Sequence, residues 1–359
     1  MLREKLETIR GFCMEPQDKI KDLYSAVKDK IDDYEQTIHA LIGFMNFYRY
    51  DDDKKIFKDH VIVFQGWRLE PINEETYSSE AGKTPFVTPD LGILYAPNQG
   101  VLVEAKKSFP SDREHWMDTF DQLMSYDNDV VGWPTANEKV DQHDIVLLLD
   151  QTRGVAVLRY YQSKEGKEIK FERPFIIIQF NRVDNRNHYY FFQKIYGSLS
   201  DKNIEGRLVE GVPVPMDVFV NIYSMIKIYD DKPPIPYLIE LIWTNVISLK
   251  ASEDPKFERL KKNQKLEIML DLDDIVQDLH QEFTFQVIYP TNSPRQKKIP
   301  RRGWIVEACE QLIQLGEAKW LDSEKKKVTI YFRKYEDILD HFIRACSQEK
   351  ENQAQPKLL

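Results

Sequence analysis

The chain has 359 residues, of which 42% are hydrophobic and 30% are charged, and its formal net charge at pH 7 is −9. This length predicts two or three domains, and the composition excludes an intrinsically disordered chain. The acidic total excludes a surface that is basic throughout, although a local basic patch can still bind nucleic acid. No run of residues approaches the roughly 18 apolar residues of a membrane span, so no membrane partner is expected.

The three cysteines, Cys13, Cys309 and Cys346, lie far apart and form no C-x-x-C pair. This spacing favours neither a disulfide framework nor a thiolate zinc site, and it fits a reducing compartment. The first residues, MLREKLETIRGF, are charged and lack an apolar stretch, so secretion is not expected. A cytoplasmic location is therefore the expectation.

The N-terminal part predicts helix, three strands, helix and strand, in this order. Residues 1–49 predict a helix with an apolar face at Ile31, Ile38 and Ile42. A capping box at Ser111–Glu114 predicts a second helix that reaches about Asp127. The strand-like runs are 60–70, 86–96, 100–108, 143–150, 154–161, 170–180 and 188–196. The turn PNQG joins 86–96 to 100–108 as a hairpin, and the apolar run 143–150 is typical of a strand buried on both faces.

The C-terminal part, after a linker-like passage that follows Gly197, predicts mainly helices. These are expected at 215–229, 235–250, 258–282 and 303–315, and Gly316 is expected to cap the last one. The runs AKWLD and KKVTIYF then predict a β-hairpin. The expected domains are 1–200, 201–346 and a disordered tail at 347–359. The expected fold class is α/β, with a mixed sheet flanked by helices and a C-terminal part that ends in a helix and hairpin like a winged helix.

Charged residues lie at the ends of two neighbouring strands in TPDLGILYAPNQGVLVEAKK (88–107). Asp90 and Glu104 can lie close together on adjacent strands, and Glu104 and Lys106 point to the same face because they are two residues apart. Hard oxygen ligands of this kind suit Mg²⁺ or Mn²⁺. A metal so held can activate water and offset the charge on a phosphate, and a lysine beside it can assist. A solvated strand rim is the alternative for each of these residues taken singly.

Pro89-Asp90 followed after thirteen residues by Glu104-Ala105-Lys106 resembles the signature of the PD-(D/E)xK nuclease superfamily. The resemblance implies a restriction-endonuclease-like core, Asp90 and Glu104 as metal ligands together with the carbonyl of Ala105, and Lys106 as a catalytic residue. Gln122 and Tyr126 are similar to the Q-x-x-x-Y of the RecB-type branch, in which these side chains contact the substrate or position the site. Their spacing of four places both on one helical face.

A further acid on the helix before the sheet is common in this superfamily. Glu35 lies at helical spacing from Ile31, Ile38 and Ile42, which predicts that it points inward. The resemblance then implies that Glu35 is a third metal-binding acid, with Glu70 as its competitor. His115 lies on the same predicted helical face as Gln122, although an ordinary surface histidine is favoured there.

A basic cluster, Arg295, Lys297, Lys298, Arg301 and Arg302, precedes the last helix with no acid among its residues. Together with Lys325, Lys326 and Lys327 of the hairpin turn, it predicts sequence-independent contacts to DNA phosphates. A solvated charge run or a surface for a protein partner is the alternative.

These observations together predict a Mg²⁺- or Mn²⁺-dependent nuclease that hydrolyses phosphodiester bonds, with DNA as substrate and a role in restriction, antiviral defence or repair. Two alternatives stay open. One is a nuclease-fold protein that binds nucleic acid without turnover, and the other is a winged-helix transcription regulator. A protein partner of the C-terminal part and self-association also stay open.

Overall fold

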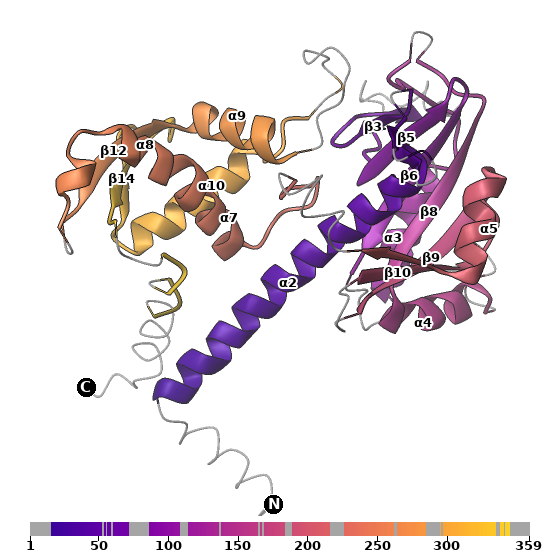
Figure 1. Cartoon of the computed structure of the whole chain (residues 1–359), viewed down its shortest axis with the longest axis horizontal. Coiled ribbons are helices and arrows are strands. Elements are labelled where there is room, and N and C mark those ends of the chain that lie inside the picture. The colour runs from indigo at the N-terminus through magenta and orange to yellow at the C-terminus, as the bar shows by residue number, and fades with distance from the viewer. Residues whose placement is uncertain are drawn as a thin grey trace, which may run out of the picture. The chain divides into compact units, whose positions relative to one another are not determined.

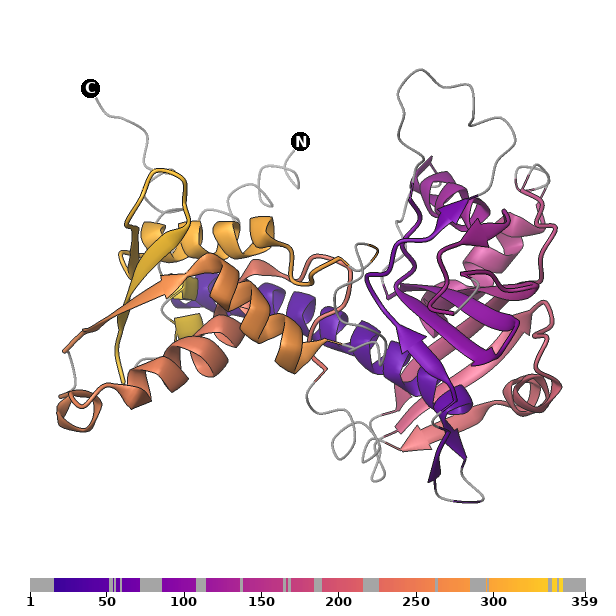
Figure 2. The same cartoon turned by 90° about the horizontal axis from the view of Figure 1, so that it is seen from above.

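A computed structural model of the chain describes residues 16–51, 54, 56–58, 60–71, 86–107, 114–135, 138–163, 166, 169–183, 189–215, 226–261, 264–284, 295, 297–334, 338–340 and 342–344. The chain divides into two compact units. Unit 1 comprises Met1–Tyr34, Lys232–Leu279 and Pro300–Leu359, and unit 2 comprises Glu35–Asp231 and His280–Ile299. Both are drawn in Figures 1 and 2.

A seven-stranded mixed sheet forms the centre of unit 2, with the strand order β11-β10-β9-β8-β6-β5-β3 (Figure 1). β6 pairs with β8 and β8 with β9 in parallel, and the other neighbours pair antiparallel. The strands are β3 (Ile62–Phe64), β5 (Leu91–Ala96), β6 (Gln99–Lys106), β8 (Gln142–Asp150), β9 (Phe175–Val183), β10 (Tyr189–Tyr196) and β11 (Val212–Pro215). The predicted α/β class and the β5–β6 hairpin are therefore confirmed.

Two short strand pairs lie outside this sheet. β1 (Tyr50–Asp51) pairs with β2 (Ile56–Phe57), and β4 (Glu70–Pro71) pairs with β7 (Val130–Val131). β8 is buried from His143 to Asp150, as predicted for a strand covered on both faces.

Helices cover both faces of the seven-stranded sheet. On one face, α3 (Glu114–Ser125) and α4 (Gln151–Tyr161) share a core with the strands, in which Phe120 and Val157 pack with Leu102 and Leu147. On the other face lies the later part of α2 (Pro16–Arg49), whose Phe47 ring meets the ring of Phe192 on β10 at 5.4 Å. α5 (Lys202–Glu210) packs against β10.

Residues 154–161 form helix α4, so the strand predicted there is wrong. β-branched and aromatic residues in GVAVLRYY favour a strand, but the N-terminal cap of the helix decides the outcome. Asp150, the last residue of β8, accepts a hydrogen bond from Thr152 N at 2.9 Å, and the helix begins at Gln151. Gly154 lets this helix approach the sheet, because a Cβ there would lie 3.0 Å from Gln179 Oε1 on β9.

Unit 1 combines helices with a three-stranded antiparallel sheet of order β12-β14-β13. Its hairpin of β13 and β14 follows α10, as predicted, and Gly316 caps that helix with a φ of +73°. Its helices are α7 (Ile235–Ile242), the π-helix η3 (Trp243–Ile247), α8 (Ser248–Glu253), the 3-10 helix η4 (Phe257–Arg259), α9 (Leu272–Phe283) and α10 (Arg302–Gln314). Its strands are β12 (Leu266–Asp271), β13 (Ala318–Trp320) and β14 (Lys327–Phe332). α9 continues past Leu279 into unit 2.

Two predicted helices differ from the structure. Within 258–282, α9 is helical as expected, but Leu266–Asp271 forms strand β12. Buried and exposed residues alternate along this segment, as is typical of a strand, and it pairs with β14. Most of 215–229 lies outside the described residues, and its described parts, Pro215 and 226–229, are not helical.

β11 joins the sheet of unit 2, which thus extends beyond the domain boundary expected at residue 200. The tail 347–359 lies outside the described residues.

Within the described ranges, no helix is both long enough and apolar enough to cross a membrane.

The Asp150 carboxylate gives a first test of the fold, because it both caps α4 and accepts a hydrogen bond from Lys107 Nζ at 2.6 Å. Burial alone would raise the pKa of Asp150, but the hydrogen bonds from Lys107 and Thr152 outweigh this and hold the pKa below its usual range. We expect Asp150→Ala to lower the free energy of unfolding by about 2 kcal/mol or more, measured by chemical denaturation.

Asp150→Ser restores a capping oxygen but not the ion pair, so it should recover part of this loss. Asp118→Ala, at an exposed acid of α3, is the control and should change the stability little. Equal stability of Asp150→Ala and wild type would contradict the cap.

Candidate active site

The predicted cluster comes together at one end of the β5–β6 hairpin. Leu91 pairs with Val103, so that the next positions outward are Asp90, just before β5, and Glu104 on β6. Both side chains are buried, with 3% and 1% of their surfaces exposed. Lys106 lies two residues after Glu104 on the same face, and α3 covers this face with Gln122 and Tyr126.

The carboxylate of Glu104 accepts three hydrogen bonds from charged or polar side chains. Lys106 Nζ donates to Oε1 at 2.6 Å, and Gln122 Nε2 and Tyr126 OH donate to Oε2 at 2.9 and 2.8 Å. Gln122 Nε2 also lies 3.1 Å from Tyr126 OH. A strand and a helix thus orient the carboxylate from both sides, and its burial is not that of a solvated strand rim.

Asp90 is held mainly by the backbone. Its Oδ2 accepts a hydrogen bond from Ala105 N at 2.9 Å, which ties the end of β5 to β6 between Glu104 and Lys106. One donor of this kind compensates a buried carboxylate far less than the three donors on Glu104. Asp90 is therefore the less satisfied of the two acids.

Burial and mutual repulsion set the charge state of both acids. Burial, followed by the negative charge of Glu104, raises the pKa of Asp90 well above its usual range. Burial also raises the pKa of Glu104, although Lys106 and Tyr126 oppose this shift. Both carboxylates therefore favour a positive charge close by, which a bound cation or a proton supplies.

Lys106 favours its protonated, positively charged form. Burial alone would lower the pKa of this lysine, but the negative charges of Glu104 and Asp90 outweigh burial and raise the pKa above its usual value. Burial and the same two acids raise the pKa of the Tyr126 hydroxyl. At neutral pH, the site thus presents an ammonium group and a neutral phenol.

Two buried carboxylates make a donor set that fits Mg²⁺ or Mn²⁺, since Mg²⁺ is commonly held by one or two carboxylates with water completing its shell. Among the residues that the structure describes, no group of three or more His, Cys, Asp or Glu side chains is arranged to hold a metal ion. The available ligands are Asp90 and Glu104.

The predicted third acid is not at this site. Glu35 is exposed, so the prediction that it points inward is wrong. Glu35 lies where α2 changes from mostly exposed residues at 22–33 to mostly buried residues at 36–48, so its helical spacing from Ile31, Ile38 and Ile42 does not bury it. Glu70 forms an ion pair with Arg295 at 3.0 Å instead. The side chain of His115 lies outside the described residues.

Two residues near the cluster carry no sequence signal that could have identified them. Asp231 Oδ2 lies 4.0 Å from Lys106 Nζ, although the two residues are far apart in the sequence. His143, buried at the start of β8, lies with Nε2 2.7 Å from the carbonyl oxygen of Tyr126. Burial lowers the pKa of His143 to about 4, so a neutral ring donates to this carbonyl and helps to hold the end of α3.

The basic cluster does not form one free cationic surface. Arg295 pairs with Glu70 and Glu138 at 3.0 Å, and Lys297 pairs with Asp230 at 3.6 Å. Arg302 lies 3.6 Å from Asp273, and Arg301 stacks on the ring of Trp304. Lys298 is exposed. Arg295, Lys297 and Lys298 belong to unit 2, whereas Arg301 and Arg302 belong to unit 1. The tertiary structure thus supplies acids that the local sequence lacks.

The hairpin turn follows the same pattern. Lys325 pairs with Glu310 and Lys326 with Glu324, and the side chain of Asp322 accepts backbone hydrogen bonds from Lys326 and Lys327. Most of the cations that predicted DNA contacts are thus already paired within the chain.

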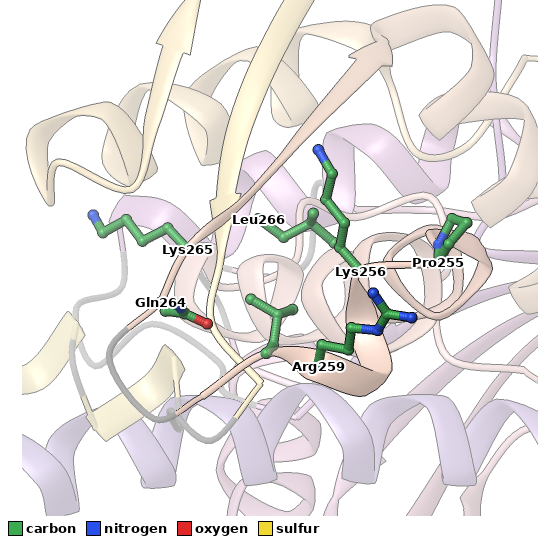
Figure 3. A pocket seen from close by; sticks show the side chains of 7 residues that line it. Pro255, Lys256, Arg259, Gln264, Lys265 and Leu266 are labelled. Carbon is green, nitrogen blue, oxygen red and sulfur yellow. The ribbon is translucent and has the colours of Figure 1, made fainter.

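A cavity of about 580 Å³ in unit 1 has a cationic lining (Figure 3). Its charged residues are Lys256, Arg259 and Lys265, and the described residues that line it include no acid. Lys265 reaches Glu317 at 3.2 Å, whereas Lys256 and Arg259 form no ion pair within the described part of the chain. The other lining residues are Pro255, Leu260, Gln264 and Leu266.

No model of a known protein family, no curated protein and no solved structure matches the chain.

The raised pKa of Asp90 predicts a pH-dependent stability. A folded state that raises a carboxyl pKa binds the proton more tightly than the unfolded state, so stability falls as the pH rises from the usual carboxyl range through the raised pKa. Asp90→Asn removes this titration and can keep the hydrogen bond from Ala105 N. In EDTA at pH 7.5, we expect Asp90→Asn to melt about 2–4 °C above wild type.

The two melting temperatures should converge as the pH is lowered toward 4. Thermal unfolding of both proteins between pH 4 and 8 measures this. A lower melting temperature for Asp90→Asn at every pH would contradict the buried, charge-disfavouring environment.

Proposed function

We propose that the chain is a divalent-metal-dependent phosphodiesterase of the PD-(D/E)xK nuclease type that acts on DNA. The observation that carries this proposal is the single hydrogen-bonded cluster of Glu104, Lys106, Gln122 and Tyr126, with Asp90 opposite Glu104 on the neighbouring strand. Five polar residues converge there, and three of them, Asp90, Glu104 and Tyr126, are buried. A purely structural core has no need of two carboxylates there.

Asp90 and Glu104 would hold the metal ion. When bound, Mg²⁺ or Mn²⁺ lowers the pKa of water and offsets negative charge that develops on the phosphate. Gln122 and Tyr126 act as positioning residues, because both donate to the same oxygen of Glu104 and fix the direction of its carboxylate.

Lys106 acts as a cation in the proposed site. The carboxylates beside it outweigh burial and raise its pKa, which favours the ammonium form over the neutral amine that would act as a base. Its contribution is therefore a hydrogen bond and a positive charge directed at a phosphate oxygen, which stabilise the negative charge of the transition state. Water then attacks phosphorus, the P–O ester bond breaks, and the leaving oxygen receives a proton, giving an alcohol and a phosphomonoester.

The test is cleavage of linear, circular and single-stranded DNA and of RNA, with Mg²⁺, Mn²⁺ or EDTA. We expect metal-dependent cleavage of DNA that falls at least about 100-fold in Asp90→Ala and in Lys106→Ala. Lys139→Ala, which removes an exposed lysine of unit 2, is the matched control and should cleave like wild type.

Cleavage that persists in Asp90→Ala or Lys106→Ala would remove the assignment of the site. A wild-type protein that binds DNA and metal but cleaves none of these substrates would favour the binding protein without turnover.

The cationic cavity is the better candidate for phosphate contacts in unit 1, which we assign as winged-helix-like. Lys256 and Arg259 line it without an ion pair in the described part of the chain, whereas the cations of the predicted cluster are largely paired. Unpaired cations release counterions from DNA when they meet phosphates, and paired cations gain less from this exchange. The same pairing gives no support to a regulator that binds DNA through residues 295–302.

Charge reversal tests this contact. The double variant Lys256→Glu/Arg259→Glu should weaken binding of a DNA duplex at least about tenfold and reduce the slope of log affinity against log salt by about 1 to 2. Fluorescence anisotropy from 50 to 200 mM salt, with Ca²⁺ in place of Mg²⁺, measures both quantities.

Lys30→Glu/Lys319→Glu is the matched control, because both lysines are exposed residues of unit 1 outside the predicted basic cluster and the change in net charge is the same. An equal loss of affinity in both double variants would indicate a non-local charge effect and count against the cavity.

A further inference from the structure

Lys106 lies between two carboxylates from distant parts of unit 2. Its Nζ lies 2.6 Å from Glu104 Oε1 and 4.0 Å from Asp231 Oδ2. Glu104 is 1% exposed, whereas the side chain of Asp231 is 53% exposed, so the nearer partner is buried and the farther partner lies at the surface. The lysine side chain has a flexible four-carbon stem that can span the difference between the two positions.

The position of Asp231 is set by its neighbours in the chain. Ile228, Tyr229 and Asp230 are buried, and Lys227 N and Ile228 N both donate to Phe283 O, at 2.9 and 3.1 Å. Lys297 pairs with Asp230 at 3.6 Å, and Tyr229 OH lies 3.5 Å from Asp231 Oδ2. An anchored segment thus presents Asp231 to Lys106, and Lys297 of the basic cluster contributes to this anchor.

A cation held by Glu104 would compete with the ammonium group of Lys106. Both would use the same carboxylate, and two positive charges in a buried position repel each other strongly. The side chain of Lys106 is 21% exposed. If Lys106 had no second partner, cation binding at Glu104 would leave a partly buried ammonium without its nearest counter-ion, which costs free energy. Asp90 also acts on Lys106, but it would hold the cation together with Glu104. Among the described acids, Asp231, whose Oδ2 lies 4.0 Å from Nζ, is therefore the one placed to accept this ammonium.

We infer that Asp231 is a positioning residue that takes over Lys106 when a divalent cation occupies Glu104. This inference rests on the proposed function. The exchange breaks one ion pair and forms another, so that Lys106 stays close to the site but leaves the carboxylate that the cation needs. No proton or covalent bond is transferred in this step.

A double-mutant cycle of Mn²⁺ affinity, measured by isothermal titration calorimetry, tests the exchange. We expect Asp231→Asn to weaken Mn²⁺ binding about tenfold, because Lys106 then stays on Glu104. In a Lys106→Met background, the same Asp231→Asn change should alter affinity less than about twofold. Asp231→Glu should restore most of the wild-type affinity, and Asp118→Asn, at an exposed acid of α3, should leave it unchanged.

Two results of this cycle would overturn the inference. An equally large effect of Asp231→Asn in the Lys106→Met background would mean that Asp231 attracts the cation directly. No effect of Asp231→Asn in the wild-type background would mean that the residue has no part in cation binding.

A second cycle without metal separates this inference from the proposed function. In EDTA, the shift of the wild-type melting temperature by Asp231→Asn should reflect only the other contacts of Asp231, such as that with Tyr229 OH, because Lys106 stays with Glu104. In a Glu104→Gln background, where Lys106 depends on Asp231, the same change should lower the melting temperature by about 2 °C more than it does in wild type. Equal shifts in both backgrounds would overturn the inference. Wild-type protein that binds no Mn²⁺ would instead overturn the proposed function, and this metal-free cycle would still decide whether Asp231 accepts Lys106.

Discussion

The buried carboxylate of Glu104 is the constraint on which the candidate site depends. A charge in that position is tolerated only if donors surround it, and the donors come from its own strand, through Lys106, and from α3, through Gln122 and Tyr126. The helix must therefore dock with one particular face toward β6. His143 holds the end of that helix by its bond to the carbonyl of Tyr126, so the first residues of β8 also take part in positioning the site.

Some basic residues of the chain form ion pairs with acids, and others do not. This difference distinguishes cations with a structural role from those that are candidates for a function. Arg295 and Lys297 pair with acids that the fold brings to them, so these two cations have a structural role in unit 2. At the β5–β6 edge the balance is reversed, because Asp90 and Glu104 are both buried, Glu104 pairs with Lys106, and Asp90 accepts a hydrogen bond from the backbone of Ala105. Such an excess of buried negative charge lowers stability, and it is also the arrangement that attracts a divalent cation.

Sequence reasoning succeeded where a local pattern and the tertiary structure agreed. The β5–β6 hairpin, the buried strand β8 and helix α10 with Gly316 all follow from turn, periodicity and cap signals that act over a few residues. Predictions from the sequence were wrong where contacts with residues distant in the sequence determine the local structure. Residues 154–161 became a helix because Asp150 caps it, and Leu266–Asp271 became a strand because β14 pairs with it. Glu35 was misplaced because it lies where α2 changes from mostly exposed to mostly buried residues.

The sequence by itself determined the chemistry of the site, because the residue types and the spacing of Asp90, Glu104, Lys106, Gln122 and Tyr126 already place each on a defined strand end or helical face. Local geometry is enough for this, since side chains two apart on a strand or four apart on a helix share a face. Only the tertiary structure decided which charges meet. It paired the basic cluster with acids, exposed Glu35 and brought Asp231 to within 4.0 Å of Lys106, because contacts between segments distant in sequence depend on how the chain packs and leave no local pattern.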